Sequence, residues 1–251
     1  MSGHSKWSKI KHQKGADDVK RGNLFTKLTR EIIIAAREGG GDPGGNFRLR
    51  LAVQKARDSN MPLDNIDRAI KKGTGDLEGG SLIEMVLEGY GPSGMAVLVS
   101  ALTDNRNRTV QEVRSTFTRH GGSMGESGCV SWIFESRGVI NINAENVDAD
   151  ELALTAIDLG AEDVQVEGGI VEVYTKPDTL EKVRAALEAK SIAIESSELQ
   201  MVPKTLVKLE EKAATQALKL LDKLEEIDDV QNVYSNADIP DSVIASIQAA
   251  L

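Results

Sequence analysis

Residues 163–175 read DVQVEGGIVEVYT, two apolar-rich runs on either side of Gly168-Gly169. The pattern predicts strands over 163–167 and 170–174 that form a hairpin. A strand and a helix are expected before the hairpin, and a helix and a strand after it, over residues 138–142, 148–160, 178–189 and 192–201. The order is βαββαβ, so the sequence predicts a self-contained ferredoxin-like domain over 137–202.

The chain on both sides of this unit is expected to supply a second α/β sandwich. Its elements are strands 85–90 and 95–102, joined by Gly91-Pro92-Ser93-Gly94, then helix 105–120, strand 130–134, helix 205–226 and strand 229–235. The part before residue 137 is ββαβ and lacks a final helix and strand, which the part after Pro203 can provide. We therefore expect a discontinuous middle domain, 81–136 and 203–240, with the ferredoxin-like domain inserted into it.

The N-terminal residues, 1–75, are expected to form a small three-helix domain. Apolar residues recur at helical spacing from Asp17 to the Gly39-Gly40-Gly41 stop, then over about 46–59, and then from Pro62 to Gly73. Residues 1–16 carry too little apolar surface to offset the entropy of ordering, so they are expected to be a flexible arm. The predicted fold class is therefore α+β.

Charge is divided unevenly along the chain, although the net charge is −9. Residues 1–73 hold 16 Lys and Arg against 8 Asp and Glu, whereas the remaining residues hold 14 against 31. This asymmetry indicates an interaction surface on the basic side, typical of a nucleic-acid partner. The alternative is internal, with the basic domain docked on the acidic one.

Other features of the sequence restrict the compartment. Cys129 is the only cysteine, so an internal disulfide is excluded and a reducing compartment is favoured. No run approaches the roughly 20 apolar residues of a membrane span, and residues 1–7 lack the apolar region of a secretory signal. We expect a cytoplasmic protein that does not contact a membrane.

Motifs for catalysis or cofactor binding are weak. Gly39, Gly41 and Gly44 match G-x-G-x-x-G, but a helix precedes them where a dinucleotide site needs a strand, so a flexible loop is the better interpretation. His4, His12 and His120 have no partner at metal-ligand spacing. Cys129, at a predicted strand edge, is expected to be a small core residue. The sequence predicts no catalytic site, cofactor or metal.

The N-terminal arm is the strongest candidate for nucleic-acid binding. Its candidate residues are His4, Lys6, Trp7, Lys9, Lys11 and Lys14. The lysines are spaced so that they can follow a phosphate backbone, and Trp7 and His4 offer flat groups for stacking on bases. The alternative is a solubilising tail whose Trp7 folds back on the helices.

Two further groups of cations are candidates. One face of the first helix carries Lys20, Lys27, Arg30 and Arg37. Arg106 and Arg108 fall in the first turn of helix 105–120, capped by Thr103 or Asp104, where the helix dipole disfavours cations. Free backbone N–H groups and two guanidiniums could bind a phosphate there. The alternative pairs these arginines with acidic neighbours such as Glu112 or Glu126.

The sequence resembles the YebC/PmpR family of probable transcriptional regulators, whose mitochondrial relatives activate translation of cytochrome oxidase. The matching stretches are Gly3-His4-Ser5-Lys6-Trp7, Phe25-Thr26-Lys27-Leu28, Asn60-Met61-Pro62, Ala69-Ile70-Lys71-Lys72-Gly73, Glu88-Gly89-Tyr90-Gly91-Pro92 and Leu102-Thr103-Asp104-Asn105-Arg106-Asn107-Arg108-Thr109. Cys129 departs from the family, in which a serine is expected. The resemblance implies three domains, no enzymatic activity, a cytoplasmic location and a role in gene expression.

Three functional hypotheses follow, and an enzyme ranks below them all. The first is a regulator that binds DNA, and the second, nearly level, is a translation factor whose arm binds ribosomal RNA or tRNA. The third is a protein–protein scaffold in which the basic domain meets an acidic partner. The oligomeric state and the nucleic-acid sequence are left open.

Overall fold

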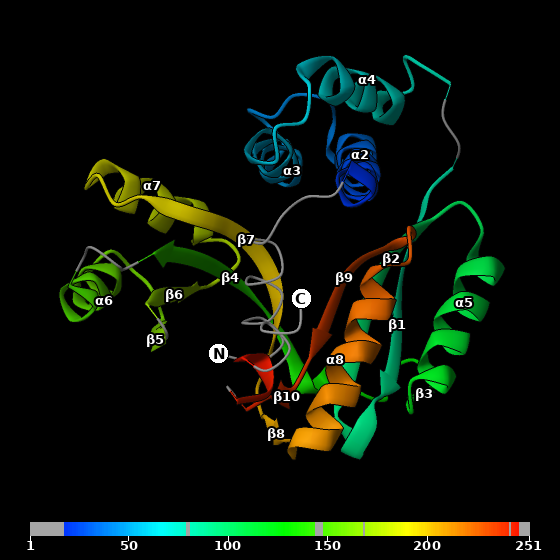
Figure 1. Ribbon diagram of the computed structural model, residues 1–251. Coiled ribbons are helices and arrows are strands. Elements are labelled where there is room, and N and C mark those ends of the chain that lie inside the picture. Colours follow the sequence, from blue (N-terminus) through cyan, green and yellow to red (C-terminus); the bar gives the residue numbers. More distant parts are fainter. Residues whose placement is uncertain (1–17, 79–80, 144–147, 168, 241, 246–251) are drawn as a thin grey trace.

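The computed structural model describes residues 18–78, 81–143, 148–167, 169–240 and 242–245, without the side chains of 18–21 and 167. It combines a helical domain, a middle sheet domain and a ferredoxin-like domain, which lie at the top, the lower right and the left of Figure 1. The predicted α+β fold class is confirmed.

The helical domain consists of α2 (Asp18–Gly39), α3 (Phe47–Asp58) and α4 (Leu63–Thr74). Asn46 is buried and fixes the turn between α2 and α3: its side chain accepts from the N–H of Leu49 and donates to the carbonyls of Ala35 and Gly40. Gly73 lets α4 approach α2 closely, because a Cβ there would lie 2.5 Å from the carbonyl oxygen of Ile33. The three helices enclose one apolar cluster, which includes Leu28, Ile32, Leu49, Ala56 and Ile66.

The middle domain contains a sheet in the order β3-β1-β2-β9. Its strands are β1 (Ile83–Tyr90), β2 (Ala96–Thr103), β3 (Ser123–Met124) and β9 (Val230–Ser235), with the short helix η1 (Pro92–Gly94) between β1 and β2. Helices α5 (Arg106–Arg119) and α8 (Glu211–Glu225) share one apolar cluster with β1, β2 and β9 and so cover one face. The late helix and strand therefore complete the sheet begun by β1 and β2, as predicted, since β9 pairs antiparallel with β2.

Two predicted elements of this domain are wrong in detail. Residues 131–133 form a short 3₁₀ helix, η2 (Ser131–Ile133), and not a strand over 130–134. The reason is Glu88, whose carboxylate accepts the N–H groups of Gly128, Val130 and Ser131, so these donors do not face a neighbouring strand. Helix 205–226 begins only at Glu211, because residues 207–208 form β8 (Val207–Lys208), which pairs with β10 (Ala237–Asp238).

The ferredoxin-like domain follows the predicted βαββαβ order. Its elements are β4 (Phe134–Asn143), α6 (Ala149–Asp158), β5 (Asp163–Glu167), β6 (Ile170–Thr175), α7 (Leu180–Ala189) and β7 (Ile194–Pro203). The sheet order is β5-β6-β4-β7 with all neighbours antiparallel, and both helices join the apolar cluster on one face. Where β4 starts and β7 ends, Phe134 and Met201 pack on Ala96, Leu98 and Tyr234 of the middle sheet.

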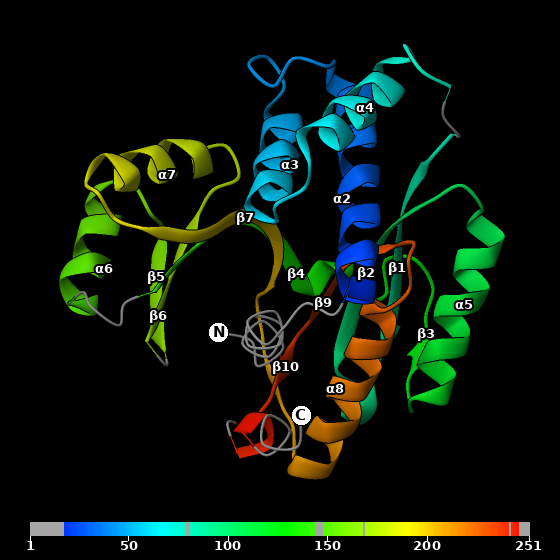
Figure 2. The same cartoon turned by 45° about the horizontal axis from the view of Figure 1, so that its top comes forward.

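One buried carboxylate connects the helical domain to the middle domain. The side chain of Asp229, just before β9, is 3% exposed and lies 3.0 Å from Arg30 of α2 and 2.7 Å from Arg108 of α5. The hydroxyls of Thr103 and Thr109 also donate to it. Figures 1 and 2 show α2 lying over the end of the middle domain at which α8 stops. We call these five side chains the Asp229 joint.

The pKa of Asp229 is held below its ordinary value of 3.8. Burial alone would raise the pKa, but hydrogen bonds from Arg108, Thr109 and Thr103 and the charge of Arg30 outweigh burial. A carboxylate whose pKa is lower in the folded chain stabilises the fold above its unfolded pKa, and this contribution is lost as the pH falls through the folded value.

The contacts of α3 with the ferredoxin-like domain complete the attachment of the helical domain. Phe47 and Leu51 pack against the apolar cluster of that domain, and Lys55 forms a 2.5 Å ion pair with Glu198 of β7. Arg48 also forms ion pairs with Glu31 and Glu38 of α2 and with Glu84 of β1. The helical domain therefore contacts both sheet domains.

Replacing Asp229 with Asn should destabilise the protein at neutral pH. The substitution removes the charge from hydrogen bonds with two arginines, and we expect the free energy of unfolding to fall by about 1.5–3 kcal/mol in urea titrations at pH 7. The difference from the unmodified chain should shrink as the pH falls below about 4, where Asp229 is protonated first in the unfolded chain and, at lower pH, in the folded chain. Asp228→Asn is the matched control, because that side chain is exposed and only its backbone carbonyl contacts Arg30. Equal effects of the two substitutions at pH 7 would contradict the joint.

We propose that the chain divides into domains at 1–75, 81–136 with 203–240, and 137–202. The apolar cluster of the ferredoxin-like domain draws its buried members from residues 140–187, so it is complete within the last of these segments. A fragment of residues 137–202 should therefore unfold cooperatively in urea, followed by circular dichroism. A fragment without a cooperative transition would show that this unit depends on the middle domain.

Candidate nucleic-acid interface

The arm predicted to bind nucleic acid lies outside the described residues. This applies to His4, Lys6, Trp7, Lys9, Lys11 and Lys14. Lys20 lies in α2, but its side chain is not among those that the structure describes. The binding role of these residues stays a prediction.

The basic face of α2 is turned toward the middle domain. Lys27 Nζ donates to the carbonyl of Glu225 at 2.5 Å, and Arg30 donates to the carbonyl of Asp228 and pairs with Asp229. Arg37 donates to the carbonyl of Leu82 at 2.6 Å. The carbonyls that end α8 carry the negative end of its dipole, which favours cations there. For these three side chains the structure shows the internal contact that was the alternative to nucleic-acid binding.

Arg108 is also engaged inside the protein. It pairs with Asp104 at 2.8 Å and with Asp229 at 2.7 Å. For Arg108 the structure therefore shows the alternative to a phosphate site, pairing with acidic residues, but the partners are Asp104 and Asp229 and not Glu112 or Glu126. The N-cap of α5 is Asn105, whose side chain accepts from the N–H of Arg108, and not Thr103 or Asp104.

Arg106 differs from Arg108, although both lie in the first turn of α5. Its side chain is exposed and makes no hydrogen bond or ion pair with the part of the chain that the structure describes. The structure therefore does not bring the two arginines together on one ligand site: one is part of the Asp229 joint, and the other faces solvent.

A second set of cations, on α3 and α4, is exposed and makes no contact with the middle domain. Arg57, Arg68, Lys71 and Lys72 are exposed, and none has a side-chain partner among the described residues. Arg68, Lys71 and Lys72 follow i, i+3, i+4 spacing and so share one face of α4, although Asp64 and Asp67 lie on the same helix. We call these four cations the α3–α4 surface. Sequence reasoning missed it, although the spacing of the three α4 residues was visible.

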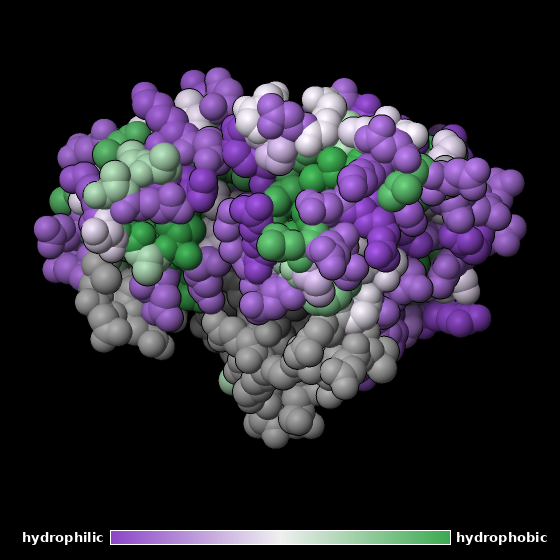
Figure 3. Space-filling view, turned by 90° about the horizontal axis from the view of Figure 1, so that it is seen from above, coloured by the Kyte–Doolittle hydropathy of each residue, from purple (hydrophilic) through white to green (hydrophobic). Residues whose placement is uncertain are grey.

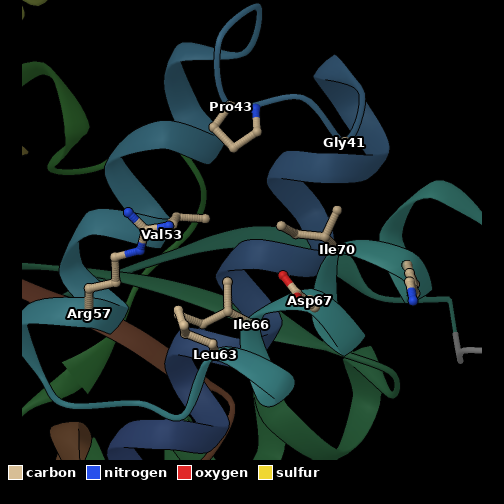
Figure 4. A pocket seen from close by; sticks show the side chains of 9 residues that line it. Gly41, Pro43, Val53, Arg57, Leu63, Ile66, Asp67 and Ile70 are labelled. Carbon is tan, nitrogen blue, oxygen red and sulfur yellow. The ribbon is translucent and has the colours of Figure 1, made fainter.

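A shallow hollow opens between α3 and α4 beside these cations. It encloses about 300 Å³, and Figure 4 shows Val53 of α3 and Leu63, Ile66 and Ile70 of α4 around it, with Arg57 at its edge. Seen from above in Figure 3, apolar groups form a patch over the helical domain, surrounded by hydrophilic residues. Leu63 is 61% exposed. The surface therefore offers an apolar contact next to positive charge.

Among the described residues, no three His, Cys, Asp or Glu side chains could hold a metal ion together. Residues 40–46 connect α2 to α3, so the glycine motif lies in a helix–helix turn. Cys129 is half-buried, and burial and the nearby Glu88 carboxylate raise the pKa of its thiol. No helix in the described ranges is long and apolar enough to cross a membrane.

Known proteins resemble the chain along most of its length. A protein of Dehalococcoides mccartyi is 62% identical over 244 residues, a match that covers 97% of both chains. A protein of Geobacter sulfurreducens is 59% identical over 239 residues, which cover 95% of this chain and 96% of the other. Both are named probable transcriptional regulatory proteins. The crystal structure of a conserved hypothetical protein from Aquifex aeolicus superposes with a TM-score of 0.82 at 50% identity, covering 89% of this chain and 92% of that one.

Two family models match the chain. The TACO1/YebC protein N-terminal domain matches residues 5–76. The TACO1/YebC second and third domain matches residues 82–237. The chain therefore belongs to the TACO1/YebC family.

Proposed function

We propose that the chain is a non-enzymatic regulator of gene expression that binds duplex DNA through its helical domain and N-terminal arm. The observation that carries this proposal is the α3–α4 surface, four outward cations on the domain whose sequence begins with the lysine-rich arm. The names of the relatives, probable transcriptional regulatory proteins, support transcription as the process. The single free cysteine fits action in the cytoplasm.

The cations of the helical domain divide into two groups by what they contact. Lys27, Arg30 and Arg37 donate to the middle domain; Lys27 and Arg30 are half-buried against it, whereas Arg37 stays exposed. The four cations of the α3–α4 surface are exposed, and α4, which carries three of them, lies above α2 and away from the middle domain in Figure 1. Cations without internal partners can each neutralise a phosphate and release a counterion, which makes binding favourable and dependent on salt.

The N-terminal arm supplies further lysines for phosphate contacts beside the α3–α4 surface. Its four lysines are spaced two to three residues apart, and this spacing can track a phosphate backbone next to the α3–α4 surface. Phosphate contacts of this kind position a protein on DNA without reading its sequence. The proposed interface therefore accounts for affinity, whereas any preference for a base sequence needs additional contacts.

Neutralising the α4 cations should weaken DNA binding without unfolding the protein. The triple substitution Arg68→Gln, Lys71→Gln and Lys72→Gln should reduce the slope of log affinity against log salt by roughly 2–3 units on duplex DNA. The control triple, Lys182→Gln, Lys212→Gln and Lys219→Gln, makes the same charge change at exposed positions of α7 and α8. Fluorescence anisotropy at several salt concentrations measures both slopes. Identical slopes for the two triples would exclude the α3–α4 surface.

Removing the arm should also lower the salt dependence of DNA binding, and substitution of Trp7 should distinguish binding to duplex DNA from binding to looped RNA. Deletion of residues 2–15 should lower the salt slope by about 3–4 units on duplex DNA. Trp7→Ala should have little effect on a duplex, whose bases are already stacked, but should cost roughly 1–3 kcal/mol on RNA with open loops if Trp7 stacks on a base. A loss confined to looped RNA would favour the translation-factor hypothesis over DNA. An unchanged slope after the deletion would contradict the role of the arm.

A further inference from the structure

An exposed tryptophan and tyrosine lie together on the middle domain. Trp132 in η2 is 69% exposed, and Tyr90 at the end of β1 is 40% exposed. The indole N–H of Trp132 and the hydroxyl of Tyr90 both donate to the carbonyl of Cys129, at 3.1 and 3.0 Å. The polar groups of both rings are therefore satisfied inside the protein, while much of the indole ring is left to solvent.

Hydrogen bonds hold the loop that carries Trp132 in place. The buried carboxylate of Glu88 accepts the N–H groups of Gly128, Val130 and Ser131 at 2.6, 2.8 and 2.8 Å. The ammonium group of Lys204 also donates to the carbonyl of Trp132, at 3.3 Å. A single exposed apolar side chain is ordinary, but an exposed aromatic ring on a pre-organised loop loses little entropy when it binds.

One cation and one carboxylate lie close to this loop. Lys204 is exposed beside Trp132, and the Glu88 carboxylate lies beneath the loop. Glu126 is the one carboxylate in the sequence from Arg119 to Trp132. An exposed aromatic ring beside a cation can bind single-stranded nucleic acid by base stacking and phosphate contact.

We propose that Trp132 is a stacking platform for an unpaired nucleobase, with Lys204 contacting the neighbouring phosphate. The proposal rests on the proposed function, in that the chain binds nucleic acid, and it adds a contact with a base outside a duplex. Figure 1 shows β3 and the start of β4, which flank the loop, at the end of the middle domain remote from α4. The Trp132 platform is therefore distinct from the α3–α4 surface, so an experiment can refute the platform without refuting that surface.

Tryptophan fluorescence can observe this platform directly. The chain has two tryptophans, so in a Trp7→Phe protein, whose own affinity is measured first, all indole emission comes from Trp132. An unstructured single-stranded oligonucleotide should quench this emission in a saturable way, because a stacked base contacts the ring. The duplex of the same length should not, because its bases are already stacked.

Affinity measurements on the full chain give a second readout. Trp132→Ala should weaken single-strand binding by about 5- to 150-fold, with little change on duplex DNA and an unchanged unfolding temperature. Lys204→Gln should lower the single-strand salt slope by about 0.7. Leu154→Ala is the matched control, since Leu154 of α6 is 71% exposed and belongs to neither surface.

The outcomes separate the platform from the proposed function. If the chain binds duplex DNA with the predicted salt dependence but Trp132 is not quenched and Trp132→Ala binds single strands normally, the platform is refuted and the proposed function stands. If Trp132 is quenched only by a protein partner and by no oligonucleotide, the platform is likewise refuted. If no nucleic acid binds in either form, both fail.

Discussion

The Asp229 carboxylate is the constraint on which the arrangement of the domains depends. A buried carboxylate is costly unless charged or hydrogen-bonding groups surround it, and Asp229 obtains them from α2, α5 and the end of β2. Because Arg30 comes from the helical domain, satisfying this charge also fixes how α2 is rotated over the middle domain. Lys27, three residues earlier on the same face, then reaches the carbonyls at the end of α8.

The rotation of α2 decides which cations remain available outside. Once its basic face is turned toward the middle domain, the cations without an internal partner on the described part of the helical domain are those of α3 and α4. The uneven charge along the sequence therefore has two consequences. Part of the positive charge attracts the acidic body and holds the domains together, and part of it faces outward on the opposite side.

Much of the fold could be predicted from the sequence because its periodicities are local and strong. The hairpin around Gly168-Gly169 led to the correct βαββαβ order, and the unpaired helix and strand after Pro203 indicated the discontinuous middle sheet. The failures came from side chains distant in sequence. Glu88 binds the N–H groups of residues 128–131 from 40 or more positions away, which no local pattern at 130–134 can reveal. The helical wheel likewise found the cationic face of α2 but not its partners, since backbone carbonyls such as that of Leu82 carry no mark in the sequence.

The way in which the ferredoxin-like domain is attached bears on how the two proposed surfaces would act together. β4 and β7 leave and re-enter the middle domain as paired strands, with Phe134 opposite Pro203, and both pack on the middle sheet near that point. Trp132 precedes Phe134 by two residues, so its loop shares this anchored base. The helical domain is in turn fixed to both sheet domains through Asp229 and through the contact of Lys55 with Glu198. The α3–α4 surface and the Trp132 loop are therefore held at opposite ends of one connected framework. A nucleic acid that contacted both would have to match that fixed separation, so its shape as well as its charge would determine binding.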